Sequence, residues 1–178
     1  LPISADNWGF TATFDLNQNV YSGGIVSGIG YPVTTGAFQQ NYAGTNANAW
    51  DIGIIKYSSD GASRIFSTYI GGSSSEMPHS LVANRYNELL IFGTTGSGNF
   101  PVSANAYDNS FNGGDALNYD NAINFQSGSD IFVFRLSENG DQMIASTFVG
   151  GSKNDGINYK SSYGNHILHG NDSLYFNY

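Results

Sequence analysis

The chain has 178 residues, including 23 glycines, 12 tyrosines and 12 phenylalanines, and it carries a net charge of −8 with only 6 lysines and arginines. So few cations do not neutralise a run of phosphates, which excludes nucleic acid as a partner. A membrane-spanning helix needs about 20 apolar residues in a row, and no apolar run in the sequence approaches that length. The lack of cysteine excludes disulfides, thiolate metal sites and a cysteine nucleophile. Abundant glycine and aromatic residues with few charges favour strands and turns over helices.

In chain order, short runs of β-branched and aromatic residues alternate with turn residues. In the first half of the chain this pattern predicts strands over 8–15, 19–26, 51–57 and 63–70. In the second half it predicts strands over 79–85, 88–95, 130–136 and 142–149. No segment shows the apolar spacing of a helix, so the sequence predicts an all-β fold.

The two halves are copies of one unit. Residues 51–72, DIGIIKYSSDGASRIFSTYIGG, align without a gap on residues 130–151, DIFVFRLSENGDQMIASTFVGG, at a spacing of 79. Residues 31–44, YPVTTGAFQQNYAG, align on residues 100–113, FPVSANAYDNSFNG, at a spacing of 69. The second copy therefore carries about ten extra residues, which fall between Gly114 and Asp130.

Each copy contains a glycine turn between its last two strands. The turns are Asp60-Gly61 and Asn139-Gly140. Both dipeptides are favoured in type I′ hairpin turns, whose two central residues need positive φ. The sequence therefore predicts type I′ hairpins at these two places.

A four-stranded unit repeated in tandem is typical of a β-propeller, in which each blade is one such sheet. We therefore predict a partial propeller over residues 1–178, with blade one at about 8–70, blade two at about 79–149 and an incomplete third blade at about 158–178. Propellers typically have at least 4 blades, so the sequence indicates a fragment of a larger protein.

The repeated pattern D-I-x-x-x-[KR]-[YL]-S-x-[DN]-G, followed by S-T-[YF]-[IV]-G-G and by [YF]-P-V-x-x-x-A-[FY], resembles the bacterial β-propeller repeat called SBBP. The resemblance covers roughly residues 8–176. It implies a large secreted or cell-surface protein like those of the Bacteroidetes, associated with the outer membrane. Such proteins often use the type IX secretion system, and many are labelled gliding-motility-associated.

Two tryptophans are candidates for ligand contact, because indole rings stack well on sugars. Trp50 has no aromatic counterpart in the second copy, and Trp8 lies in the first predicted strand. Other aromatic residues recur in both copies, as Tyr31 and Phe100 do, and this recurrence favours packing between strands. Trp50 and Trp8 are therefore the predicted ligand-binding residues.

The inserted loop offers oxygen ligands for a metal. Asp115, Asp120 and Asp130 lie among asparagine and glycine residues, and calcium takes such ligands. The spacing of a known calcium loop is absent, so a plain surface loop is the alternative, and no cofactor other than calcium is expected. Asp51 and Asp130 begin corresponding strands, and this repetition favours a structural role for both.

No catalytic residues are predicted. His166 and His169 are three apart, which places them on opposite faces of a regular strand, and His79 stands alone. The three glutamates lie in places where exposure is expected: Glu76 in a link, Glu88 at a strand start and Glu138 in a turn. Ser173 lies in a short Asn-Asp-Ser-Leu sequence that matches two glycosylation motifs, so it is a candidate modification site.

Together these features predict a non-catalytic, secreted cell-surface propeller segment that acts in adhesion or in protein or glycan contact. It would be cargo of type IX secretion or part of a motility or secretion assembly. Its partners would be other envelope proteins, surface glycans and the remaining blades of the same polypeptide. The alternative is a propeller module of a polysaccharide-degrading enzyme whose catalytic residues lie largely outside this segment.

Overall fold

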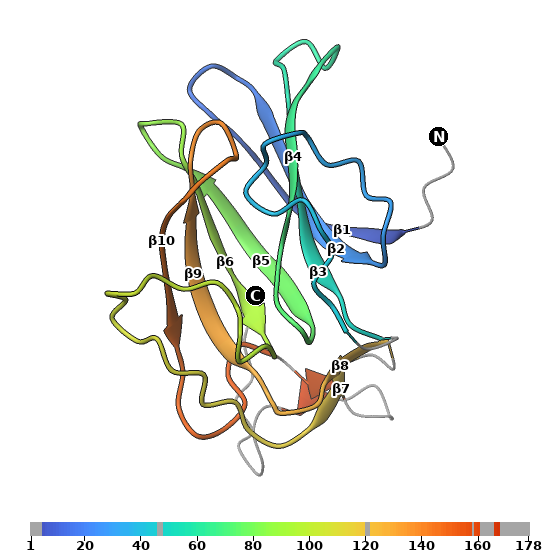
Figure 1. The fold of residues 1–178 in the computed structure, drawn as a ribbon, viewed down its shortest axis with the longest axis vertical. Coiled ribbons are helices and arrows are strands. Elements are labelled where there is room, and N and C mark those ends of the chain that lie inside the picture. The colour runs from blue at the N-terminus through green and yellow to red at the C-terminus, as the bar shows by residue number, and fades with distance from the viewer. Residues whose placement is uncertain (1–4, 46–47, 120–121, 158, 161–165, 168–178) are drawn as a thin grey trace.

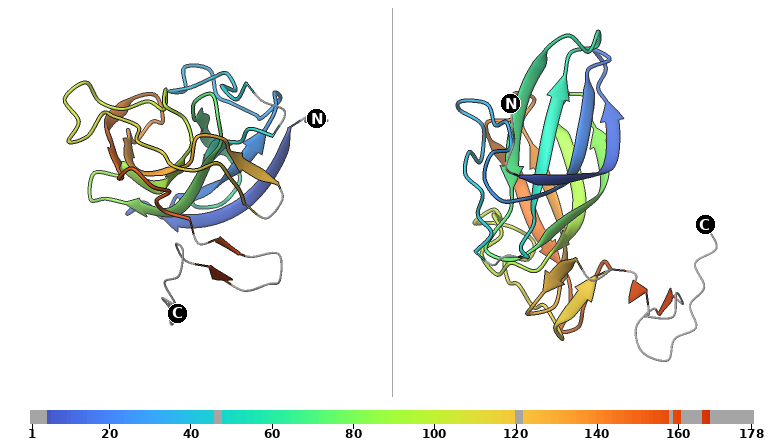
Figure 2. Two further views of the ribbon diagram at one scale, coloured as in Figure 1. Left: turned by 90° about the horizontal axis from the view of Figure 1, so that it is seen from below. Right: turned by 90° about the vertical axis from the view of Figure 1, so that its right-hand side faces the viewer.

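The computed structural model describes residues 5–45, 48–119, 122–157, 159–160 and 166–167. This part of the chain is all-β, as the sequence predicts, and most of its strands form two four-stranded antiparallel sheets (Figure 1). None of the described elements is a helix that is long and apolar enough to cross a membrane. The two sheets lie face to face (Figure 2), and the described residues do not by themselves close into a propeller.

The first sheet has the strand order β1-β2-β3-β4. Its strands are β1 (Asp6–Phe14), β2 (Val20–Ser27), β3 (Asp51–Tyr57) and β4 (Arg64–Ile70). The four strands expected in the first half of the chain are therefore present, each paired with its neighbour in sequence. We call β1–β4 with the segment 28–45 the first unit.

The second sheet has the order β5-β6-β9-β10 and copies the first. Its strands are β5 (Glu76–Ala83), β6 (Leu89–Thr95), β9 (Asp130–Leu136) and β10 (Met143–Val149). The segment between Gly114 and Asp130, which holds the extra residues of the second copy, contains a separate hairpin of β7 (Leu117–Tyr119) and β8 (Ile123–Phe125). We call β5, β6, β9 and β10 with the segment 97–113 the second unit.

A further short pair, β11 (Tyr159–Lys160) and β12 (His166–Ile167), follows the second unit. Most of the predicted third blade at about 158–178 lies outside the described residues. The third blade therefore stays a prediction.

The two units share small features of the backbone. The first strands of the two sheets, β1 and β5, each carry one register shift at corresponding positions, between Gly9 and Thr11 and between Pro78 and Ser80. In the turn that follows, one side-chain oxygen of Asp15, and likewise of Asn84, accepts two backbone N–H groups. Such local hydrogen bonds explain why both turns use a short Asx side chain at this position.

The glycine turns differ from the prediction. Gly61 and Gly140 have φ of 70° and 73°, but Asp60 and Asn139 do not have positive φ. The Gly61 N–H donates to the Ser58 carbonyl at 2.8 Å, so the glycine is the fourth residue of its turn and not a central one. The type I′ prediction is therefore wrong, because in these longer loops only the glycine needs the left-handed region.

The repeated segments 31–44 and 100–113 cover the outer edges of the two sheets. The Ser67 N–H on β4 donates to Thr34 Oγ1 at 2.8 Å, and the Ser67 carbonyl accepts the Thr34 N–H at 2.9 Å. Ser146 on β10 makes the same two bonds with Ser103, at 2.9 and 3.0 Å. These bonds pair some of the backbone N–H and C=O groups of each edge strand, which would otherwise be free to pair with a strand of another chain.

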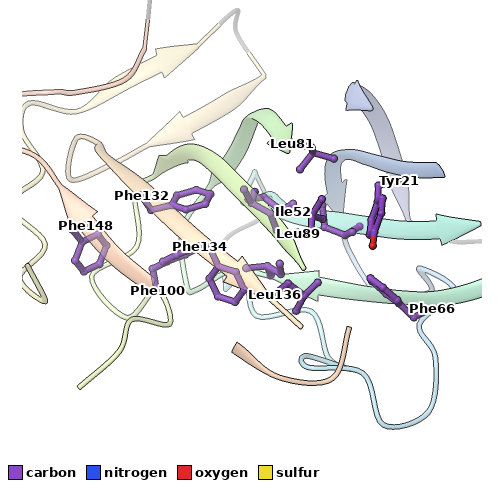
Figure 3. Close-up of a cluster of buried hydrophobic side chains, with 13 residues drawn as sticks. Tyr21, Ile52, Phe66, Leu81, Leu89, Phe100, Phe132, Phe134, Leu136 and Phe148 are labelled. Carbon is purple, nitrogen blue, oxygen red and sulfur yellow. The ribbon is translucent and has the colours of Figure 1, made fainter. Parts of the chain in front are cut away.

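The core lies between the sheets and extends under the segments that cover the edges (Figure 3). β5 contacts β1, β2 and β3. Gly23 permits close approach, because a Cβ there would lie 2.9 Å from Leu81 Cδ1 and the leucine side chain would have to shift. Phe100 packs against Phe132 with a ring distance of 4.4 Å, and its counterpart Tyr31 packs in the first unit, as the recurrence of the pair predicts.

Candidate interaction surface

The second sheet covers one face of the first sheet, which we call the covered face. The strand register places apolar residues and one lysine on it, and every residue in the following list is at most 2% exposed. These residues are Tyr21, Ile25, Ile52, Ile54, Lys56, Phe66, Thr68 and Ile70.

The second sheet carries the same pattern on the side turned away from the first, which we call the open face. Its residues at positions corresponding to the covered face include Leu90, Phe92, Ile131, Val133, Arg135, Ala145, Thr147 and Val149. Phe92 and Val149 are 38% and 44% exposed. Arg135 takes the place of Lys56, and Val133 takes the place of Ile54. The open face therefore has the composition of an interface and is accessible to solvent except at one end, where Gly156 lies against Thr94 and Ile131.

The opposite end of the stack is also apolar. On the outward face of the first sheet, Phe14, Val20 and Tyr57 are direct cross-strand neighbours and are 64%, 43% and 37% exposed. Their counterparts in the second unit face the first sheet; these are Ala83, Leu89 and Leu136. The outward face of the first sheet therefore matches the face with which the second unit packs on the first.

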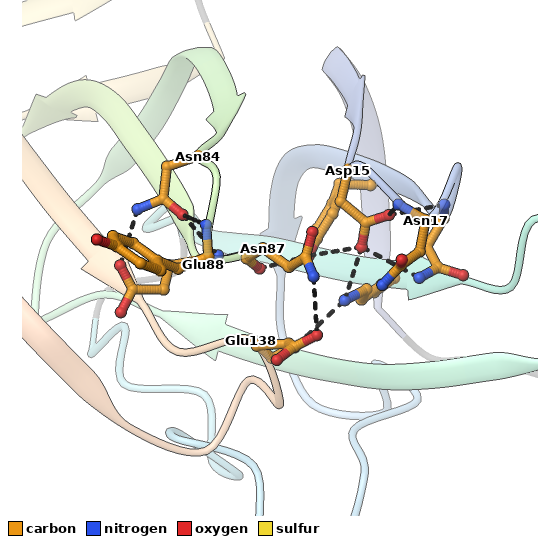
Figure 4. A network of polar contacts seen from close by, with 10 residues as sticks. Asp15, Asn17, Asn84, Asn87, Glu88 and Glu138 are labelled. Atoms are coloured by element: carbon orange, nitrogen blue, oxygen red, sulfur yellow. Dashed lines mark hydrogen bonds and ion pairs between the residues drawn. The ribbon is translucent and has the colours of Figure 1, made fainter.

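A buried ion pair lies at one end of the junction between the units (Figure 4). Lys56 Nζ is 3.0 Å from Asp15 Oδ2, and both side chains are at most 3% exposed. Lys56 also donates to the Glu138 carbonyl of the second unit at 3.4 Å, and the Tyr21 hydroxyl donates to the Asn87 carbonyl at 3.0 Å. One cation thus links the first unit to a turn of the second.

Electrostatics keep this pair charged. Burial alone would raise the pKa of Asp15, but hydrogen bonds from Lys56 and Asn19 hold it below its ordinary value. Arg135, the counterpart of Lys56, pairs instead with Glu88, the counterpart of Asn19. Arg135 Nε lies 3.5 Å from Glu88 Oε2, and the Arg135 side chain is 42% exposed. Its position on the open face leaves Arg135 accessible to an incoming group.

Two carboxyl groups are buried where the first unit joins the second. Asp51 Oδ2 accepts the Ala43 N–H at 2.8 Å, and Glu76 Oε2 accepts the Gly72 N–H at 3.0 Å. Burial raises the pKa of Asp51 to about 7. Burial, together with the charge of Asp51, raises the pKa of Glu76 to about 8. The expectation that Glu76 is exposed is wrong, because the strand β5 begins at this residue and places its side chain inside.

The second unit repeats this arrangement with Asp130 and Asp155. Asp130 accepts the N–H groups of Asn112 at 2.7 Å and Gly113 at 2.9 Å, and Asp155 accepts the Gly151 N–H at 2.8 Å. The repeated use of Asp51 and Asp130 to bind backbone N–H groups agrees with the structural role that their recurrence predicts.

The two candidate ligand-binding tryptophans lie together. The rings of Trp8 and Trp50 are 4.9 Å apart, and their exposed fractions are 47% and 7%. The Trp50 Nε1–H donates to the Ala122 carbonyl at 3.1 Å, which ties the first unit to the inserted loop. Trp8 is therefore the exposed member of the pair, and it packs against the buried Trp50.

The candidate calcium ligands are not brought together among the described residues. Asp130 is buried and bound by N–H donors, whereas the Asp115 side chain is 88% exposed and lies 3.9 Å from Lys153 Nζ. Asp120 lies outside the described residues, as does Ser173. In the part of the chain that the structure describes, no three His, Asp or Glu side chains gather in a way that would hold a metal ion.

The two described histidines lie in different sheets. His79 Nε2 is 2.7 Å from Thr94 Oγ1, within one sheet. His166 lies in β12, and His169 lies outside the described residues.

Comparison with known protein families and with curated proteins finds no match to this sequence.

The open face is the feature that sequence reasoning missed. The signal was present in the repeat, because the spacing of 79 residues pairs Lys56 with Arg135 and Ile54 with Val133. The sequence shows that these positions are equivalent, but only the stacking of the sheets shows that one set is covered and the other is open.

Proposed function

We propose that this chain is a non-catalytic structural segment of a secreted, cell-surface β-propeller protein of the SBBP type. The observation that carries the proposal is the open face of the second sheet, which has apolar and basic residues at the positions of the covered face and over which no other sheet of the described residues packs. A further four-stranded unit is the occupant that fits such a face, because the second unit occupies the equivalent face of the first.

The way the units stack supports continuation. The second unit uses one face to cover the first, and the first unit offers the equivalent of that face on its outward side, at Phe14, Val20 and Tyr57. A contact that joins two different faces is heterologous, so it repeats until it closes into a ring or extends as a filament. A closed ring of four-stranded sheets is a β-propeller.

The role in surface contact rests on the architecture and on the resemblance. Rigid sheets carry loops at their ends, and such loops are where binding residues are commonly found. The net charge of −8 gives the exterior a repulsive and soluble character. Within the proposal, the loops contact other envelope proteins or surface glycans, with Trp8 as the exposed aromatic residue.

The test uses two double variants that each block one face. Phe92→Lys with Val149→Lys blocks the open face, and Phe14→Lys with Val20→Lys blocks the outward face of the first sheet. We expect the unmodified chain to associate with rising concentration, each variant alone to stay monomeric, and their mixture to form a 1:1 dimer through the two intact faces. Sedimentation velocity measures all three, and Leu16→Lys with Tyr86→Lys adds the same charge outside both faces as a control.

The proposal fails if the unmodified chain stays monomeric at about 1 mM, where contacts worth about 4 kcal/mol become visible. It also fails if either variant dimerises alone, because the contact would then not join the two faces. Labelling of the native polypeptide on intact cells tests the surface location separately.

A further inference from the structure

The junction between the units contains a turn inserted into a recess. The turn of the second unit that ends at Gly140 lies against the Phe66 ring of the first, and a Cβ on Gly140 would lie only 2.3 Å from that ring. The Gly140 carbonyl accepts the Phe38 N–H at 2.9 Å, and the Glu138 carbonyl accepts a hydrogen bond from Lys56. The recess therefore recognises a glycine turn through its backbone.

The second unit has an open cavity at the corresponding place. It has a volume of about 430 Å³ and is bordered by Leu90, Val133, Arg135 and Ala145 of the sheet and by Ala106 and Tyr107 of the edge segment. Three of these residues are counterparts of residues that contact the inserted turn: Tyr107 corresponds to Phe38, Arg135 to Lys56 and Ala145 to Phe66. The Tyr107 side chain is 94% exposed, whereas the Phe38 ring packs 5.4 Å from Phe134 of the second unit.

The first unit presents the complementary feature. Its turn at Asp60 and Gly61 is exposed, and a Cβ built on Gly61 would meet no atom within 4 Å. Gly61 has φ of 70° against 73° for Gly140, and in both turns the glycine N–H bonds to the carbonyl of the serine three residues earlier. The exposed turn thus has the shape of the inserted one.

We propose that the cavity between Tyr107 and Arg135 is a socket for the Asx-Gly turn of another four-stranded unit, for which Asp60-Gly61 of a second copy of this chain is a ready occupant. In this contact Tyr107 N–H binds the glycine carbonyl, and Arg135 binds the carbonyl two residues before it, as Phe38 and Lys56 do within the chain. Because Ala145 is smaller than Phe66, the socket is deeper at this position than the filled recess. The inference rests on the proposed stacking of units and adds to it a specific point of recognition.

Disulfide crosslinking tests this inference, because the chain has no cysteine of its own. One copy carries Ala106→Cys beside the socket, and another carries Asp60→Cys in the turn. The matched reference is a single chain with Ala37→Cys and Asn139→Cys, which are the equivalent positions at the filled recess. We expect the reference to close its disulfide and the two separate copies to form a linked dimer under mild oxidation.

The control pairs Asp60→Cys with Ala37→Cys, beside a recess that the chain's own turn already fills. We expect about tenfold less linked dimer from this pair, because a disulfide needs Cα atoms within about 7 Å. Ala145→Trp, a change at an exposed position, fills the socket and should reduce linkage of the Ala106→Cys copy to the control value.

The outcomes separate the two proposals. If the unmodified copies associate in sedimentation but the Ala106→Cys and Asp60→Cys pair links no better than the control, the socket inference is wrong and the stacking proposal stands. If the copies do not associate at all, both are wrong. If linkage occurs and Ala145→Trp does not reduce it, the turn does not enter the socket and the inference is again wrong.

Discussion

The carboxyl groups of Asp51 and Glu76 lie against the same residue, Gly71. A Cβ at Gly71 would be 2.7 Å from Asp51 Oδ1 and 2.6 Å from Glu76 Oε2. Asp51 Oδ1 is buried and has no hydrogen-bond partner among the described residues. Burial raises the pKa of both carboxyl groups, and the charge of Asp51 raises the pKa of Glu76 further.

This pair predicts a stability that depends on pH. The folded state keeps protons that the unfolded chain releases near its ordinary carboxyl pKa values, so the free energy of unfolding should fall as pH rises from about 4 to about 8, by about 1.4 kcal/mol per pH unit for each retained proton. Asp51→Asn should flatten this dependence and make the chain more stable than the unmodified protein at pH 8, because a neutral amide is placed beside Glu76. Urea unfolding at several pH values measures the effect.

The control for this prediction is Asp130→Asn in the second unit. Its neighbouring acid Asp155 is partly exposed, so the change in pH dependence should be smaller. An equal flattening by both variants would contradict the interpretation that the buried pair at Gly71 causes the dependence.

Lys56 and Arg135 occupy equivalent positions with different burial. Lys56→Met leaves the buried carboxylate of Asp15 without its cation, and we expect a loss of about 3 kcal/mol in the free energy of unfolding at pH 7. Arg135→Met removes an exposed pair and should cost less than about 1 kcal/mol.

The Lys56→Met loss should also shrink as pH falls through the lowered pKa of Asp15, since a protonated Asp15 needs no cation. Urea unfolding at pH 7 and under acid conditions checks both statements. Equal losses from Lys56→Met and Arg135→Met at pH 7 would show that the difference in burial has no energetic effect.

Gly140 and Gly61 form a second matched pair. Both have left-handed φ, so replacing either glycine with alanine should cost about 1 kcal/mol for the backbone alone. Gly140→Ala should cost clearly more than Gly61→Ala, because its Cβ would meet the Phe66 ring while a Cβ on Gly61 would meet open space. Thermal and urea unfolding of the two variants give the comparison, and indistinguishable losses would argue against the inserted turn.

The hydrogen bonds between the segment 31–44 and the edge strand β4 lead to a local prediction. Thr34→Val removes the oxygen that accepts the Ser67 N–H, so the free energy of unfolding should fall by about 1 kcal/mol. Amide hydrogen exchange of Ser67 should accelerate, while the neighbouring exposed change Thr35→Val should leave it unchanged. Unaltered exchange at Ser67 in the Thr34→Val variant would contradict the role given to the segment 31–44.

Some errors of the sequence interpretation have local causes. The glycine turns were expected to be type I′ because Asp-Gly and Asn-Gly favour that turn, but hydrogen bonding back to Ser58 and Ser137 makes the loops longer. Glu76 was expected to be exposed because it follows a Gly-Gly-Ser link. Its carboxyl group accepts a hydrogen bond from Gly72 in the link itself and another from Thr95 on the neighbouring strand β6, which the link alone does not reveal.

The amino-acid sequence was enough to predict the eight strands of the two large sheets, their order along the chain and the equivalence of the two units. These features follow from alternation of side chains and from turn residues, which act over a few positions, and the duplication makes each unit a check on the other. Which face of each sheet is covered became known only from the packing of the two sheets. Ile54 and Val133 are equally apolar, so burial of one and solvent access of the other follow from the stacking of whole sheets, which no local pattern records.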